Sequence, residues 1–210
     1  MEVHPPHHPI LSVKEFMVHL LAITIGLLIA LGLEGSVEWL HHRHLASDAR
    51  ENIVQEVRAN QADVIRQLNA LPAEEKRLDE ILSLVDDVQH GRSHKPLGNF
   101  MWTGVLLNDS AWNATSSTGA IAFMDYSEVK GYSQLYAVQK LYGSITDRDL
   151  AGRHEMNVFL ERMEGTDKLS DAEFESEKKI ILSQKLVVRE FRELDTLLNG
   201  IYTKLLSQAG

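Results

Sequence analysis

Histidine is the residue type in this chain whose number and placement most suggest chemistry. Two groups of three flank an apolar segment: His4, His7 and His8 before it, and His41, His42 and His44 after it. Neutral imidazoles bind zinc, copper or nickel, and three of them can form a site. A helix that crosses a bilayer would keep the two groups on opposite sides, and adjacent helical residues point about 100° apart. We therefore interpret the histidines as interfacial polar residues, with a metal or redox accessory role as the alternative.

Glu38 and His41 form one copy of the Glu-x-x-His pattern with which di-iron carboxylate bundles bind metal. A complete site needs a second copy and two further glutamates on other helices. The nearest second copy begins with Asp87, an aspartate in place of the glutamate, near a predicted helix end. We predict no bound metal, and the residues that would hold one are Glu38, His41, His42 and His44.

Motifs for catalysis are missing from the sequence. The chain has no cysteine, which excludes thiolate metal sites, iron–sulfur clusters and thiol nucleophiles. It has no Gly-rich phosphate loop, no nucleophile elbow and no His-Glu-x-x-His motif. The formal net charge of −9 argues against nucleic acid, because binding to phosphates needs clustered Lys and Arg. We predict a protein that is not an enzyme, has no cofactor and binds no nucleic acid.

Aromatic residues gather in the middle of the chain. They are Trp112, Tyr126, Tyr132, Tyr136 and Tyr142. Aromatic side chains at helical spacing usually pack in a core, although the spaces between bundle helices can also bind ligands. We expect core packing here, and the residues that would line a pocket are Trp112, Tyr132 and Tyr136.

An apolar run from Phe16 to Leu33 carries no formal charge, and His19 is its one ionisable residue. A helix of that length covers about 27 Å, close to the hydrocarbon thickness of a bilayer at ~30 Å. Trp39 follows the run at a place typical of an interfacial aromatic residue. His19 lies near the edge of the run, where it can reach headgroups or stay neutral; a proton-relay or ligand role is the alternative. The sequence predicts a polar tail over residues 1–15, a transmembrane helix and junction over residues 16–40, and the lipid bilayer as a partner.

A buried core helix and a cleavable signal peptide are the alternatives to a membrane anchor. Core helices rarely run this far without a charge, and Ala30-Leu31-Gly32 resembles a cleavage site. The preceding segment has only Lys14 as a basic residue, however, and the helical pattern continues past the cut, so we predict an uncleaved, single-pass anchor. Lys14 on one side nearly balances Arg43 and Arg50 on the other, and we place the N-terminus in the cytoplasm.

Small residues at four-residue spacing mark one face of the predicted anchor. Ala22, Gly26 and Ala30 form two overlapping small-x-x-x-small steps. Small side chains let transmembrane helices approach closely. This face is the predicted helix–helix contact, and we expect a homo-oligomer or a larger membrane complex.

The anchor is expected to continue as a long helix to about Leu71, with an apolar stripe. The stripe comprises Ile53, Val57, Val64, Leu68 and Leu71. Asn60 lies inside it and could set the register of a contact with a second chain. The alternative is that the stripe packs inside its own bundle. Pro72 is predicted to end this helix and to begin another that runs to Gly91.

The remainder predicts a crossover loop and three further helices. Residues 91–109 form the loop, and Ser110 begins a short helix to about Met124. Capping boxes begin the next two helices, at Asp125 with Glu128 and at Ser170 with Glu173. The last helix carries an apolar seam at coiled-coil spacing: Val187, Phe191, Leu194, Leu198, Ile201 and Leu205. The predicted fold is all-α, an N-terminal transmembrane helix running into a long-helix antiparallel bundle over residues 41–210.

Two segments resemble a bacterial family of small single-pass membrane proteins of unknown function. The first is GLLIALGLEGSVEWLHHRH, and the second is NDSAWNATSSTGAIAFMDYSEVKGYSQLYAVQKLY, with Trp112, Gly119, Tyr132 and Tyr136 at matching places. The resemblance implies an N-terminal transmembrane helix followed by an all-helical extramembrane domain. Its motifs are structural and bring no activity with them.

Taken together, the sequence predicts a membrane-anchored, non-enzymatic helical protein that acts as a structural, assembly or accessory subunit. It would lie in the bacterial inner membrane with its soluble domain in the periplasm. A ligand-sensing helical bundle, motivated by the aromatic residues, is the alternative, and a His-based metal or redox accessory protein comes after it.

Overall fold

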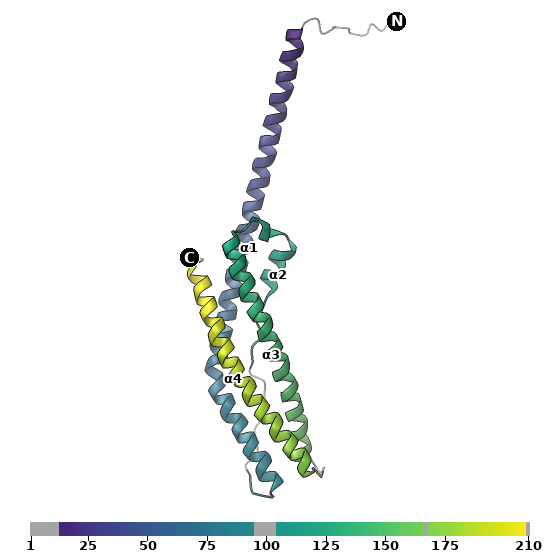
Figure 1. The fold of residues 1–210 in the computed structure, drawn as a ribbon, viewed down its shortest axis with the longest axis vertical. Coiled ribbons are helices and arrows are strands. Elements are labelled where there is room, and N and C mark those ends of the chain that lie inside the picture. The colour runs from purple at the N-terminus through teal and green to yellow at the C-terminus, as the bar shows by residue number, and fades with distance from the viewer. Residues whose placement is uncertain (1–12, 95–103, 166–167, 209–210) are drawn as a thin grey trace, which may run out of the picture. The chain divides into compact units, whose positions relative to one another are not determined.

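The computed structural model describes residues 13–94, 104–165 and 168–208, and in these ranges it is helical without any strand. Its elements are α1 (Val13–Gln89), α2 (Ser110–Ser117), the short 3-10 helix η1 (Ala120–Phe123), α3 (Tyr126–Glu164) and α4 (Asp171–Gln208) (Figure 1). The all-α prediction is therefore confirmed. The chain divides into two compact units, Met1–Asp48 and Ala49–Gly210.

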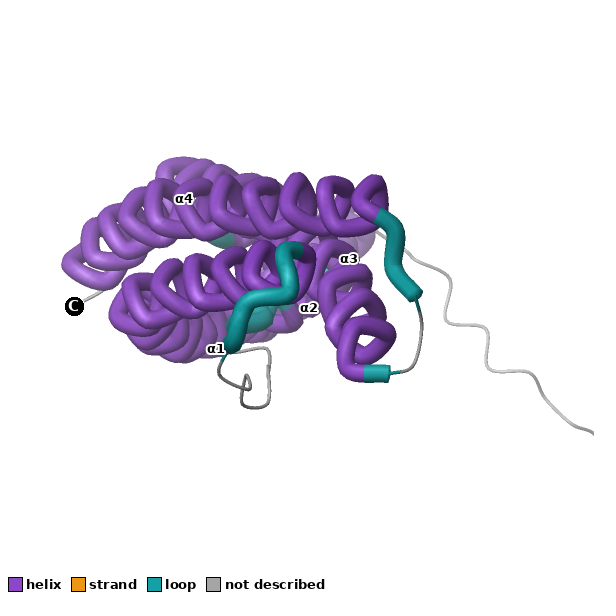
Figure 2. The backbone as a smooth tube through the Cα atoms, turned by 90° about the horizontal axis from the view of Figure 1, so that it is seen from below, coloured by secondary structure: helices purple, strands orange, loops and turns teal. Residues whose placement is uncertain are grey.

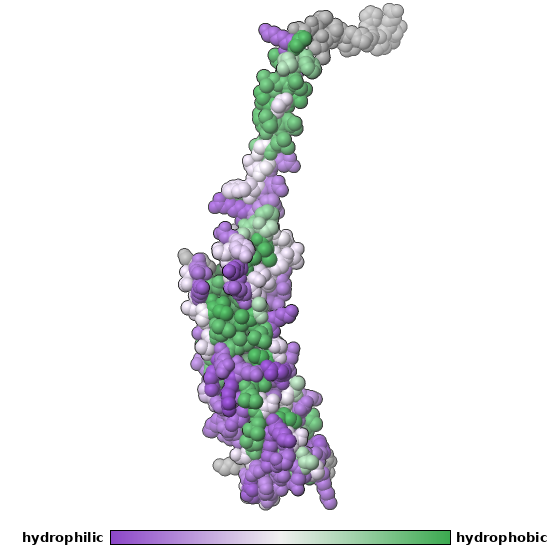
Figure 3. All heavy atoms as spheres, in the orientation of Figure 1, coloured by the Kyte–Doolittle hydropathy of each residue, from purple (hydrophilic) through white to green (hydrophobic). Residues whose placement is uncertain are grey.

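The described part of the first unit is the N-terminal portion of α1, which carries apolar side chains over one stretch and polar side chains after it (Figure 3). Its most apolar window has a mean hydropathy of 2.5, and 0% of that window is buried. By length and composition, α1 is the one helix in the described ranges that could cross a membrane. The predicted tail residues His4, His7 and His8 lie outside the described residues.

In the second unit, α4 runs antiparallel to α1. Arg192 of α4 pairs with Glu75 of α1 at 2.9 Å, and Lys178 pairs with Asp86 at 2.6 Å. The residue numbers fall along α4 as they rise along α1, which fixes opposite directions. Both views show these helices side by side with α3 (Figures 1 and 2).

Helices α1 and α3 run parallel to each other. Arg50 pairs with Glu128 at 2.7 Å, and Arg153 pairs with Glu74 at 2.8 Å, so the numbers rise together on the two helices. Two neighbouring parallel helices need a connection that returns along their length. The predicted crossover loop lies at this point of the chain, between α1 and α2, and its residues 95–103 lie outside the described residues.

The described end of the crossover is held by polar side chains of α1. Asn60 binds the backbone of Asn108 at both groups: its Nδ2 donates to the carbonyl oxygen at 2.7 Å, and its Oδ1 accepts from the amide at 2.9 Å. Gln67 Oε1 accepts from the amide of Val105 at 3.0 Å and from the hydroxyl of Tyr142 at 2.7 Å. An extended segment beside a helix has no backbone partners of its own, so these side chains supply them.

The apolar stripe of α1 is buried within its own unit. Ile53, Val57, Val64 and Leu71 are all buried, as are Val187, Phe191, Leu194 and Leu198 of the seam on α4. Asn60 binds the crossover segment, so it does not set the register of a contact with a second chain within this arrangement. The alternative in which the stripe packs inside its own bundle agrees with the structure.

The predicted helix end at Pro72 is wrong, because α1 continues through this residue to Gln89. A proline inside a helix lacks an N–H and crowds the carbonyl four residues earlier, which costs about 3 kcal/mol. Contacts with α4 offset that cost on both sides of the proline. Gln61 donates to Asn199 at 2.9 Å before it, and Arg192 binds Glu75 after it.

The helix starts at Asp125 and Ser170 were predicted correctly, and the single helix to Met124 was not. Both halves of the Asp125–Glu128 capping box are formed, and the Ser170 amide and hydroxyl each donate to Glu173 at 2.8 Å. The short helix stops instead at Ser117, because Gly119 takes the left-handed conformation at φ +76° and separates α2 from η1.

Replacing Gln67 with leucine should reduce the free energy of unfolding by roughly 2 to 4 kcal/mol. The leucine keeps the volume but removes the acceptor, and the Val105 amide and the Tyr142 hydroxyl lose their partner. Urea unfolding of the full chain in non-ionic micelles, followed by circular dichroism, measures the change. Gln55→Ala on the exposed face is the control, with an expected change within about 0.5 kcal/mol. Equal stability of Gln67→Leu and wild type would contradict the role given to this contact.

Candidate functional site

The predicted metal residues lie in the first unit and are only partly brought together. The Nε2 of His42 is 4.0 Å from a carboxylate oxygen of Glu38, and the rings of His41 and His42 are 6.0 Å apart. His44 is exposed. The described residues contain no group of three His, Cys, Asp or Glu placed to hold a metal ion.

The small residues of the predicted helix–helix contact are exposed on α1. Ala22, Gly26 and Ala30 all lie on the open surface of the first unit. A Cβ atom added at Gly26 would meet nothing within 4 Å, and the same holds for Gly32. The described chain therefore leaves this face uncovered and open to contact with another molecule.

The aromatic residues named for a pocket lie in packed contacts. Trp112 stacks on Tyr136 with ring centroids 5.2 Å apart, and the Tyr136 hydroxyl donates to Glu56 at 2.6 Å. Burial, and after it the bond to Glu56, raises the pKa of Tyr136, so the phenol stays neutral and donates. Tyr132 is buried as well. Tyr132 and Tyr136 are thus part of the bundle core, and the half-buried Trp112 covers Tyr136.

A buried charged cluster joins α3 to α1. The Nε of Arg153 donates to Asp149 at 2.9 Å, and its Nη1 lies 2.8 Å from Glu74. All three side chains are buried. A buried ion pair contributes little net stability, but removing one partner leaves an uncompensated charge and destabilises strongly. The sequence analysis missed this cluster, although Asp149 and Arg153 fall at helical spacing between apolar residues of the same face.

Asp195 is a carboxyl group enclosed by the bundle. It is 0% exposed, and neither of its oxygens has a hydrogen-bond partner among the described residues. Burial raises the pKa of Asp195 to about 7. Burial, and after it the charge of Asp195, also raises the pKa of Tyr142, which places the two groups close together. Asp195 is thus protonated in the folded protein under mildly acidic conditions.

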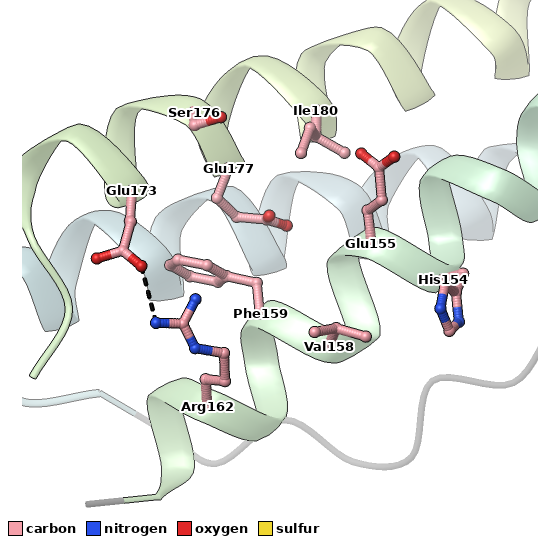
Figure 4. A pocket seen from close by; sticks show the side chains of 9 residues that line it. All are labelled: His154, Glu155, Val158, Phe159, Arg162, Glu173, Ser176, Glu177 and Ile180. Carbon is pink, nitrogen blue, oxygen red and sulfur yellow. Dashed lines mark hydrogen bonds and ion pairs between the residues drawn. The ribbon is translucent and has the colours of Figure 1, made fainter. Parts of the chain in front are cut away.

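A groove of about 400 Å³ lies between α3 and α4 (Figure 4). Its lining comprises His154, Glu155, Val158, Phe159, Arg162, Glu173, Ser176, Glu177 and Ile180. Phe159 packs edge-on against Phe174 with centroids 5.5 Å apart, so the groove has an apolar base. Of its nine lining residues, Val158, Phe159 and Ile180 are apolar and the other six are polar or charged, and the exposed His154 and Glu155 lie on its α3 side.

The two glutamates that α4 contributes to the groove differ in their partners. Glu173 accepts from Arg162 at 2.8 Å and from Ser170, and these bonds, the Ser170 amide first, lower its pKa to about 2. Glu177 is 2% exposed, and its buried Oε1 has no hydrogen-bond partner among the described residues. Burial, and after it the charge of Glu155, raises the pKa of Glu177 to about 7. The uncompensated carboxyl group of the groove is therefore Glu177.

Sequence reasoning also missed Glu177, and the signal for it was helical spacing. Phe174, Ile181 and Val188 are buried on α4, and Glu177 lies on the same face one turn before Ile181. An acidic residue on a buried stripe requires a partner or a functional reason. No protein-family model, curated protein or solved structure matches this chain. Membership of the bacterial single-pass family stays a prediction, and function is argued from the chemistry of the groove and of the apolar segment.

Asparagine at position 195 should change the pH dependence of stability. The folded-state pKa of about 7 lies above the unfolded value near 3.9, so the Asp195 contribution is full below pH 4 and falls as the pH rises toward 7. Between pH 4.5 and pH 8, wild type should therefore lose at least about 1 kcal/mol of its free energy of unfolding relative to Asp195→Asn. Urea unfolding at both pH values measures it, and a constant difference would contradict the assignment.

Proposed function

We propose that this protein is a single-pass, membrane-anchored, non-enzymatic helical protein that acts as a structural, assembly or accessory subunit. The observation that carries the proposal is the apolar portion of α1. Its hydropathy is that of a membrane span, and 0% of its most apolar window is buried. Burial of apolar surface contributes about 25 cal/mol per Å², so such a segment requires an apolar environment that the described chain does not provide.

The proposed compartment is supported by the family resemblance. We place the anchor in the bacterial inner membrane and the second unit in the periplasm. Arg43 stacks over the ring of Trp39 at 5.4 Å, an arrangement that suits the headgroup region, where an indole ring and a cation both find partners. The absence of cysteine is compatible with either side of the membrane.

Assembly, if it involves a second copy, would use the anchor. The apolar stripe of the second unit is buried within that unit, which leaves the face with Ala22, Gly26 and Ala30 as the proposed helix–helix contact. A larger membrane complex would use the same face with another helix.

The intact chain should stay in the membrane fraction after washes with high salt and with alkaline carbonate. Apolar burial in a bilayer does not depend on ionic strength, whereas a peripheral protein held by charge is released. Immunoblots of the washed membrane and soluble fractions measure the distribution. A soluble protein whose N-terminus lies near Leu33 would show instead that the segment is a cleaved signal peptide.

Gly26→Leu should weaken self-association in the membrane by tenfold or more and leave the second unit folded. The added side chain meets nothing within its own chain, so any loss must arise between chains. Gly32→Leu is a matched control, since it lies six residues on and about 120° around the helix. Fluorescence energy transfer between labelled copies in liposomes measures association. A wild type that is monomeric at every protein-to-lipid ratio would defeat the homo-oligomer and leave a complex with another protein.

A second function, ligand sensing by the bundle, is favoured by one observation. The groove between α3 and α4, of about 400 Å³, is lined by the buried Glu177, whose Oε1 has no hydrogen-bond partner among the described residues. Of the aromatic residues that first suggested sensing, Tyr132, Tyr136 and Tyr142 are buried, whereas Tyr126 is 82% exposed and does not pack in the core as expected. The α3–α4 groove takes their place as the proposed sensing site.

A further inference from the structure

The groove between α3 and α4 presents two carboxyl groups on facing helices. Figure 4 shows Glu177 extending from α4 into the groove, with Glu155 on the α3 side. The charge of Glu155 acts on Glu177, which shows that the two groups are close. Glu177 Oε1 is buried without a hydrogen-bond donor among the described residues. A buried carboxyl oxygen without a donor is costly, typically by ~1–3 kcal/mol, so the site is incomplete as the chain alone forms it.

Two basic residues, Arg162 and His154, are among the described residues that line the groove. Arg162 is the arginine of the lining, and it binds Glu173 at 2.8 Å. His154 is the other basic residue that lines the groove, and it lies on α3. A ligand that brings N–H donors and positive charge would supply the donor that Glu177 Oε1 lacks among the described residues, beside the exposed carboxylate of Glu155.

The remaining walls restrict the class of cation. The described residues contain no group of three His, Cys, Asp or Glu placed to hold a metal ion, so the site does not offer a metal its usual ligand number. Val158, Phe159 and Ile180 present hydrocarbon instead. The volume of about 400 Å³ lies within the range of small-molecule sites. An organic cation with an apolar part satisfies both halves of the lining.

We propose that the α3–α4 groove binds a small organic cation, a primary ammonium on a short alkyl chain. The ammonium donates hydrogen bonds to Glu177 and Glu155, and the alkyl chain packs on Phe159 and Ile180. A charge-assisted hydrogen bond of this kind is about twice as strong as a neutral one. The site is formed within the second unit and does not depend on the anchor proposed above.

Binding of this cation should strengthen as the pH rises. Glu177 binds an ammonium only when ionised, and with a pKa of about 7 its ionised fraction rises about tenfold between pH 6 and pH 8. The other charged groups that line the groove are His154, Glu155 and Arg162 on α3 and Glu173 on α4. An imidazole also titrates in this range, so His154→Gln separates the two contributions. The pH dependence should persist in that variant.

The test is calorimetric titration of n-butylammonium chloride into the full chain in non-ionic micelles at pH 8. We expect saturable one-to-one binding that weakens about tenfold at pH 6 and is lost by tenfold or more in Glu177→Gln. Glu155→Gln should weaken binding less, because its carboxylate is not the buried one. Glu193→Gln, an exposed glutamate on the same helix, is the matched control and should bind as wild type does. The neutral isostere n-butanol should show no saturable binding.

Several outcomes would overturn the proposal. Unchanged affinity in a folded Glu177→Gln, equal binding of n-butanol, or affinity that does not depend on pH would each show that the carboxyl pair does not recognise the ammonium. Displacement of n-butylammonium by millimolar Mg²⁺ would assign the groove to a metal ion instead. Circular dichroism establishes whether Glu177→Gln folds; if it does not, the comparison of n-butylammonium with n-butanol on wild-type protein, at pH 6 and pH 8, decides.

Discussion

The parallel arrangement of α1 and α3 is the constraint on which the rest of the second unit depends. Two parallel neighbours oblige the chain to return along the bundle between them, and a returning segment carries backbone groups that no helix satisfies. Asn60 and Gln67, on the buried side of α1, form hydrogen bonds with these backbone groups. Glu56 does the same further along by accepting from the amide of Ala111 at 2.8 Å. The polar residues of α1 are therefore as much a part of the fold as its apolar stripe.

A polar interface in the middle of a bundle has consequences for the other helices. The hydroxyls of Tyr136 and Tyr142 donate hydrogen bonds to Glu56 and Gln67. At these buried positions of α3 a tyrosine is therefore required, where a bundle with an apolar core would have leucine. Arg153 adds a charged contact to Glu74 at the same interface. Such groups contribute little net stability, but a mispaired register would leave them buried without partners. They favour this packing over the alternatives that a uniform apolar seam would allow.

Features that depend on local sequence patterns were predicted correctly, whereas features that depend on contacts between distant parts of the chain were not. The capping boxes at Asp125 and Ser170 and the apolar run near the N-terminus are readable within a few residues. Pro72 is not, because α1 continues through it beside partners that are distant in the chain: Arg153 of α3 binds Glu74, and Arg192 of α4 binds Glu75. Glu177 and Asp195 were missed for a related reason: a periodic pattern identifies the buried face, but acidic residues on that face are easily taken as solvated.

Those two acidic residues differ in their position, and this difference is the reason that a binding role is proposed for Glu177 alone. Both are buried, lack a partner at one or both oxygens, and have a pKa raised to about 7. Asp195 is 0% exposed and is not among the residues that line the groove. Its protonation therefore affects the free energy of unfolding. Glu177 lines a groove with hydrocarbon walls, and a cation from outside can reach it. Burial makes the ionised form of a carboxyl group unfavourable, and a bound cation can relieve this cost only where the carboxyl group lines an open groove.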